Sequence, residues 1–206
     1  MIKNIVFDIG NVLAGFTWRE YYRSFGFSDE ITERLSQATV LSPLWHEIDY
    51  GKMTTEAIIQ GFKDRDPGIT AEIEQVYANI AGMVTRYDYA RPWITELKEQ
   101  GYKIYIISNI SDKVLQDCHR ELDFLPLVDG AVFSYREMLV KPDGAIYQCF
   151  LKRYQLIPDE CIFLDDQEKN VITAQEQGMA AILFENYEQA RNELNRYLEK
   201  ANGTLI

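Results

Sequence analysis

Five short apolar segments, separated by longer stretches with helical periodicity, constrain the fold of this chain most strongly. The segments span residues 2–7, 103–107, 131–133, 161–164 and 180–184. Their apolar residues do not alternate strictly with polar ones, which is typical of strands buried on both faces of a parallel sheet. Helices are expected at residues 92–100, 112–122, 145–154, 168–177 and 187–200. This alternation predicts an α/β fold with a doubly wound parallel sheet and right-handed crossovers.

One large insertion comes after the first expected strand. It spans residues 15–87 and contains helical patterns at 18–25, 29–38, 55–62 and 70–84, with few strand-like runs. We interpret it as a small α-helical cap standing over the sheet. The predicted division is therefore an α/β catalytic core of residues 1–14 and 88–206, with a helical cap of residues 15–87.

Composition excludes several classes of protein. With 21 Lys and Arg against 32 Asp and Glu, the net charge is −11, so we expect no nucleic-acid surface. No run of 18 apolar residues and no signal-peptide pattern occur, so we expect no membrane association and a cytoplasmic location. The three widely spaced cysteines are expected to be free thiols. A monomer is the default expectation.

Polar residues follow four of the expected strands, at the sheet edge where open α/β sheets bind their ligands. They are Asp8, Gly10 and Asn11 after the first strand, Ser108 and Asn109 after the second, Lys141 after the third, and Asp165 and Asp166 after the fourth. Each of these groups alone is ordinary turn chemistry. Together, three carboxylates, a hydroxyl and an ammonium at one edge of a sheet favour magnesium-assisted phosphoryl transfer.

The chemistry assigns a role to each of these side chains. Asp8 is the expected nucleophile, forming an aspartyl-phosphate. Asp8, Asp166 and a backbone carbonyl near Gly10 offer the hard oxygen ligands that Mg²⁺ prefers. Ser108 and Lys141 would contact and neutralise the phosphate oxygens. Asp165 would either hold Lys141 or bind a metal-bound water, and both options stay open.

Four motifs resemble those of the haloacid dehalogenase-like (HAD) hydrolases, in the same order. They run from Phe7 to Leu13, from Ile107 to Asn109, over Lys141-Pro142, and from Phe163 to Asp166. The form of the first and last motifs is most similar to the branch containing the bacterial α-D-glucose-1-phosphate phosphatase. The resemblance implies a HAD-type Rossmann-like core with a helical cap, and a Mg²⁺-dependent phosphatase acting on a small phosphate ester, with a sugar phosphate as the leading expectation. It also implies catalytic and binding residues, namely Asp8 and Lys141 for catalysis, Ile9, Gly10, Ser108, Asn109 and Lys141 for phosphate, and Asp8, Gly10 and Asp166 for the metal, with Asp165 as an additional candidate.

One position departs from the family pattern. Most phosphatases of the family carry a second Asp two positions after the nucleophile, as general acid and base, and here that position is Gly10. A replacement acid from the cap or entry loop is one explanation, with Glu20, His46 and Glu47 as candidates. A substrate whose leaving group departs without much help is another. Loss of the acid would otherwise slow the reaction on the order of 10²–10⁴-fold.

Two other functions remain open. A metal-free 2-haloacid dehalogenase shares Asp8, the Ser-Asn pair and Lys141, but the Asp165-Asp166 pair disfavours it. A non-catalytic phospho-ligand-binding or regulatory scaffold is the third possibility, because of Gly10. Among the aromatic residues, Phe16 and Trp18 are the expected substrate contacts.

Overall fold

A five-stranded parallel sheet lies at the centre of the molecule. The computed structural model describes residues 1–201. The strand order is β5-β4-β1-β6-β7, and every pair of neighbours is parallel. The bounds are β1 (Asn4–Phe7), β4 (Lys103–Ser108), β5 (Gly130–Phe133), β6 (Cys161–Asp165) and β7 (Ala180–Leu183). The predicted α/β fold is confirmed, and each expected strand is present.

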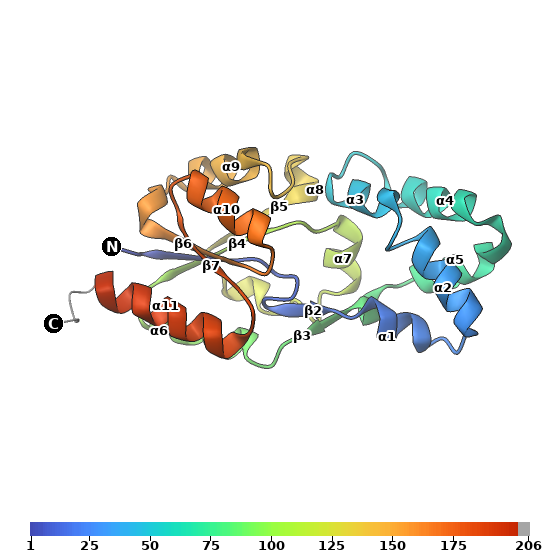
Figure 1. Ribbon diagram of the computed structural model, residues 1–206, viewed down its shortest axis with the longest axis horizontal. Helices are drawn as coiled ribbons and strands as arrows, with labels where there is room; N and C mark the ends of the chain where they lie inside the picture. Colours follow the sequence, from blue (N-terminus) through green and yellow to red (C-terminus); the bar gives the residue numbers. More distant parts are fainter. Residues whose placement is uncertain (202–206) are drawn as a thin grey trace.

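Helices cover both faces of the sheet (Figure 1). One face packs against α6 (Ala90–Glu99) and α11 (Tyr187–Ala201), the other against α9 (Gly144–Tyr154) and α10 (Glu168–Glu176). Alternate residues of β1 face opposite layers: Phe7 meets Trp93 of α6, with ring centroids 4.9 Å apart, while Val6 joins the cluster on the α9 side. Because both faces are covered, the strands are apolar except at their ends.

A helical segment lies beyond the carboxyl ends of the strands (Figure 1). It contains α1 (Trp18–Arg23), α2 (Asp29–Ala38), α3 (Pro43–Asp49), α4 (Thr55–Arg65) and α5 (Thr70–Tyr77). Three buried hydroxyl groups hydrogen-bond to one another in its interior: Tyr22 Oη lies 2.7 Å from Thr39 Oγ1 and 3.0 Å from Tyr77 Oη. Of these five helices, α3 is not predicted by the sequence patterns.

A short antiparallel ribbon joins this segment to the sheet. Strands β2 (Ala14–Phe16) and β3 (Val84–Arg86) pair with Ala14 opposite Arg86. The expectation of a single helix over residues 70–84 is therefore wrong. The chain leaves the helix after Tyr77 because the Asn79 side chain accepts a hydrogen bond from the Ala81 amide at 2.9 Å, which competes with helical bonding.

The helix expected at residues 112–122 is also shorter than predicted. It is α7 (Asp112–Asp117), and the chain after it turns towards the ribbon. The Asp117 carboxylate accepts a hydrogen bond from the Ile80 amide, and Glu121 accepts one from the Arg86 amide. These carboxylates tie the core to the chain that enters and leaves β3.

The remaining short elements lie in loops. They are α8 (Ser134–Glu137) and 3₁₀ turns at Pro67–Ile69, Ala81–Met83, Leu125–Leu127 and Pro158–Glu160. The three cysteines are free thiols, as expected. Within residues 1–201, no helix combines the length and the apolar character needed to cross a bilayer.

Candidate active site

Three carboxylates meet at the carboxyl ends of β1 and β6. Asp8 comes directly after β1, Asp165 is the last residue of β6, and Asp166 comes next. Because Phe7 pairs with Leu164 in the parallel register, Asp8 and Asp165 leave the sheet side by side. One oxygen of each carboxylate lies within 4.8 Å of the others. Asp8 and Asp165 are buried, while Asp166 is partly exposed.

Lys141 lies between two of these carboxylates. Its Nζ is 2.8 Å from Asp8 Oδ1 and 2.6 Å from Asp165 Oδ2, and its side chain is only 1% exposed. Burial alone would lower the pKa of this ammonium, but the two carboxylates raise it above its ordinary value. Lys141 is therefore a fixed positive charge beside Asp8.

Asn109 positions the backbone of Lys141. Its Oδ1 accepts a hydrogen bond from Lys141 N at 2.8 Å, and its Nδ2 donates to Lys141 O at 3.0 Å. Both polar atoms of the side chain are thus engaged within the protein. Ser108, the preceding residue and the last of β4, is buried at the same edge. The second and third motifs are in direct contact.

Asp165 is fully occupied by protein donors. Its Oδ1 accepts from the Gln167 amide at 2.8 Å and from Asn170 Nδ2 at 2.9 Å. Its Oδ2 accepts from Lys141 Nζ and from Asn170 Nδ2 at 3.0 Å. Of the two roles that the sequence left open, this geometry favours holding Lys141.

The oxygen atoms around Gly10 are suitable ligands for a hard divalent cation. Asp166 Oδ2 accepts from Asn11 Nδ2 at 3.0 Å and from Gln167 Nε2 at 2.9 Å, which orients the carboxylate towards the loop after β1. The Gly10 carbonyl accepts none of the hydrogen bonds formed within residues 1–201. Carboxylates and a free carbonyl are the ligand types that Mg²⁺ prefers. Asp8, Asp166 and the Gly10 carbonyl are therefore suitable metal ligands.

The Asp8 carboxylate is held in a place that disfavours its charge. Burial is the main cause, and it raises the pKa of Asp8 from 3.8 to about 6. Lys141 opposes this rise, while the nearby charge of Asp165 adds to it. The Ile9 amide donates to Asp8 Oδ1 at 2.7 Å. A bound cation would favour the charged form and so assist a carboxylate nucleophile.

A cavity of about 220 Å³ opens above these residues. Asp8, Gly10, Ser108 and Asp166 line it from the sheet. From the other side it is lined by Phe16 of β2 and by Trp45, Ile48 and Asp49 of α3. Phe16 and Trp45 stack with centroids 5.5 Å apart.

The structure separates the two aromatic candidates. Phe16 lines the cavity, and its contact with substrate stays a prediction. Trp18 does not: it is 6% exposed and packs edge-on against Tyr22, with centroids 5.5 Å apart. As the first residue of α1, Trp18 lies on the side of that helix that faces the interior of the helical segment.

Asp49 is the ionisable cavity residue that the sequence patterns did not reveal. The sequence Asp49-Tyr50-Gly51 is typical of a turn, but Asp49 is the last residue of α3. Burial, followed by the charge of Asp8, raises the pKa of Asp49 from 3.8 to about 7. The three acid candidates that the sequence offers, namely Glu20, His46 and Glu47, are exposed and do not line the cavity.

A glycine lets the end of α3 approach the core. Gly51 has a φ of +63°, and a Cβ at this position would collide with the backbone of Tyr135 in α8. Only glycine combines this conformation with this approach. The contact between α3 and α8 places Asp49 over the sheet edge.

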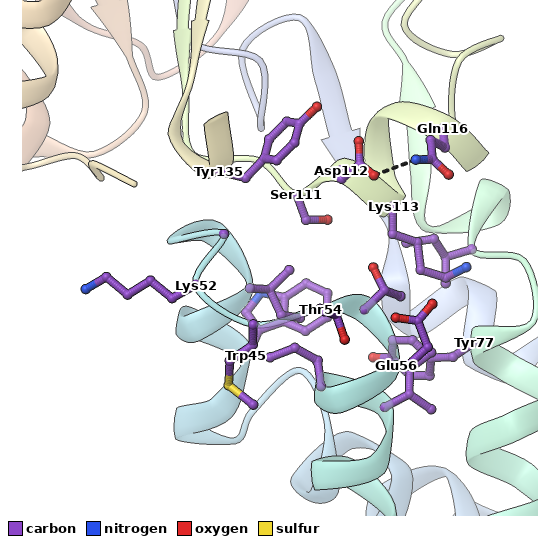
Figure 2. A pocket seen from close by; sticks show the side chains of 17 residues that line it. Trp45, Lys52, Thr54, Glu56, Tyr77, Ser111, Asp112, Lys113, Gln116 and Tyr135 are labelled. Carbon is purple, nitrogen blue, oxygen red and sulfur yellow. Dashed lines mark hydrogen bonds between the residues drawn. The ribbon is translucent and has the colours of Figure 1, made fainter. Parts of the chain in front are cut away.

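A larger cavity of about 650 Å³ adjoins the first (Figure 2). It lies between the helical segment and the core, and the two cavities share Trp45, Ile48 and Ser111. Figure 2 shows Ser111, Asp112, Lys113, Gln116 and Tyr135 on one side, facing Trp45, Thr54, Glu56 and Tyr77 on the other. Its lining is therefore rich in hydroxyl, amide and charged groups.

Comparison with known proteins identifies the family. A profile of the haloacid dehalogenase-like hydrolases matches residues 2–178. This chain belongs to that family. The HAD-like hydrolase is 28% identical to the D-ribitol-5-phosphate phosphatase of Bacteroides thetaiotaomicron over 94% of its own length and 97% of the relative's. It is 29% identical to the sesquiterpene phosphatase astK of Aspergillus oryzae, over 87% and 88% of the two chains.

A solved structure confirms the fold. A HAD family enzyme from Bacteroides thetaiotaomicron, in complex with magnesium and inorganic phosphate, superposes with a TM-score of 0.71 at 21% identity. The superposition covers 92% of this chain and 99% of the other. The predicted Rossmann-like HAD fold is therefore confirmed.

Proposed function

We propose that this HAD-like hydrolase is a Mg²⁺-dependent phosphatase that hydrolyses a small phosphorylated metabolite through an aspartyl-phosphate on Asp8. The observation that supports this most directly is the position of Lys141 Nζ, between Asp8 Oδ1 and Asp165 Oδ2. A buried cation beside a carboxylate that lines a small cavity suits the attack of that carboxylate on a dianionic ester. The phosphatase names of two full-length relatives add to this support.

Each residue of the site has its own part in the reaction. Asp8 attacks phosphorus, and Lys141 and Ser108 stabilise the charge on the phosphoryl oxygens. Mg²⁺, held by Asp8, Asp166 and the Gly10 carbonyl, would supply further charge neutralisation. Asp165 fixes Lys141, and Asn109 fixes the backbone that carries it.

A sugar phosphate is the substrate class that we propose. The larger cavity offers Ser111, Asp112, Gln116 and Thr54 to the hydroxyl groups of a polyol leaving group. The ribitol-phosphate activity of one relative supports the same class. We further propose that residues 15–87 act as the cap, which excludes bulk water when it closes over the substrate.

Hydrolysis of p-nitrophenyl phosphate, with Mg²⁺ and with EDTA, tests this function. We expect turnover that needs Mg²⁺ and is lost in Asp8→Asn, because the amide cannot attack phosphorus. Turnover that persists in Asp8→Asn, or a folded wild type that binds Mg²⁺ without turnover, would refute the proposal. Chloride release from 2-chloropropionate without metal would instead indicate the dehalogenase.

A further inference from the structure

We propose that Asp49 supplies the general acid that Gly10 cannot, from α3 rather than from the loop after β1. This inference rests on the proposed phosphatase function. It assigns a catalytic role to a residue outside the four motifs.

The first support is the position of Asp49. It lines the same cavity of about 220 Å³ as Asp8 and Gly10, on the opposite wall. The ester oxygen of a phosphoryl group bound at Asp8 would lie in this cavity, which Asp49 lines as well. The leaving group would extend towards the adjoining larger cavity, past Trp45 and Ile48.

The second support is that the Asp49 carboxyl group has no hydrogen-bond donor or cation as a partner within residues 1–201. The neighbouring acids of the site differ in this respect, because Asp165 is saturated and Asp166 is bound by Asn11 and Gln167. A partly buried carboxyl group without a structural partner is available to a substrate.

The third support is the space above Gly10. A Cβ built on Gly10 meets no atom within 4 Å, and its φ lies outside the left-handed region. The place of the family's usual acid is therefore open, and the facing wall of the cavity holds Asp49 instead.

The environment also favours a proton on Asp49 near neutral pH. Burial raises the pKa of this carboxyl to about 7. Its place at the C-terminus of α3, the negative end of the helix dipole, favours the neutral form as well. Acids tuned to near the working pH are the effective general acids.

Asp49 gives up a proton in the first half-reaction and regains one in the second. Asp8 attacks phosphorus, the P–O bond to the leaving group breaks, and the Asp49 proton passes to the departing oxygen, giving an alcohol. The Asp49 carboxylate then takes a proton from water, whose oxygen attacks the aspartyl-phosphate. The acyl phosphate P–O bond breaks, Asp8 and inorganic phosphate are released, and Asp49 is protonated again.

A pair of substrates of equal shape tests the assignment. Phenyl phosphate and p-nitrophenyl phosphate differ mainly in how much their leaving group needs a proton. For both, kcat/KM reports the steps up to phosphorylation of Asp8. We expect Asp49→Asn to lower kcat/KM for phenyl phosphate on the order of 10²-fold, and that for p-nitrophenyl phosphate by less than about tenfold. Glu47→Gln, an exposed carboxyl of the same helix, is the matched control and should change neither.

Equal losses on both substrates, or no loss on either, would overturn the assignment while leaving the phosphatase function intact. A wild type without Mg²⁺-dependent turnover would overturn the function itself. A second variant shows whether the loss in Asp49→Asn comes from the missing acid rather than from a damaged fold, because only a missing acid can be replaced by a new carboxyl group. In that background, Gly10→Asp should restore kcat/KM for phenyl phosphate at least about tenfold, because the open space admits a carboxyl group. Failure to restore it would count against the proposal.

Discussion

Burying the charged Asp8 carboxylate destabilises the folded protein. The Asp8→Asn variant measures the size of this destabilisation. Asparagine has the shape of the neutral acid, so the variant mimics an Asp8 that never ionises. Raising a pKa from 3.8 to about 6 corresponds to about 3 kcal/mol of free energy between the two protonation states. Without metal, the variant should therefore be more stable than the wild type by about 3 kcal/mol at pH 8.

The pH dependence of this difference comes from the same shift. Between pH 3.8 and about 6, the folded state binds more protons at Asp8 than the unfolded state does. The wild type therefore loses stability as the pH rises through this window, and the penalty is complete above it. The advantage of the variant should shrink towards zero as the pH falls from 8 to 4, because other titrating groups are common to both proteins.

Urea unfolding of both proteins in EDTA, at pH 8 and at pH 4.5, gives the measurement. In thermal unfolding at pH 8, a stabilisation of about 3 kcal/mol corresponds to a rise in Tm of about 6–12 °C for a chain of this size. A variant less stable than the wild type at pH 8 would refute the reasoning. So would a stability difference that does not change with pH, because the gain would then come from packing rather than from the buried charge.

Two further predictions concern residues that position the site. Asn109→Ala removes two hydrogen bonds to the backbone of Lys141. We expect the free energy of unfolding, measured in urea, to fall by about 2 kcal/mol and kcat to fall on the order of 10²-fold. An unchanged kcat would contradict the positioning role. Gly51→Ala should lower kcat/KM at least about tenfold, because the new Cβ pushes α3 away from α8. Gly26 is the control: its φ of +71° is similar, but a Cβ there would meet no atom within 4 Å, so Gly26→Ala should leave kcat/KM unchanged. Equal effects of the two glycine variants would mean that backbone strain, not the contact, is responsible.

The sheet and its polar edge could be predicted because they depend on local patterns and one general rule. Apolar runs identify strands, and parallel strands bring the residues at their carboxyl ends to a common edge. The sequence alone therefore predicts that Asp8, Ser108, Lys141 and Asp166 lie together. Even so, only the structure shows that Lys141 and Asp165 form an ion pair, since the sequence permitted two roles for Asp165.

The arrangement of the helical segment could not be predicted in the same way. Asp49 approaches Asp8 only because α3 ends against α8, and that contact depends on Gly51 and on a backbone far away in sequence. The three-residue strands β2 and β3 carry too little sequence for a period to be recognised. Short-range patterns thus located one wall of the cavity and, of the other wall, only Phe16.

The β2–β3 ribbon has a consequence for how such a molecule can be altered. The segment between Phe16 and Val84 enters and leaves through two adjacent, hydrogen-bonded strands, so its ends are already neighbours. A two-residue Asn-Gly turn joining them would make a β-hairpin without disturbing the order of the five parallel strands. The junction is therefore a suitable graft point, where helical segments of other lengths can be exchanged above an unchanged sheet edge.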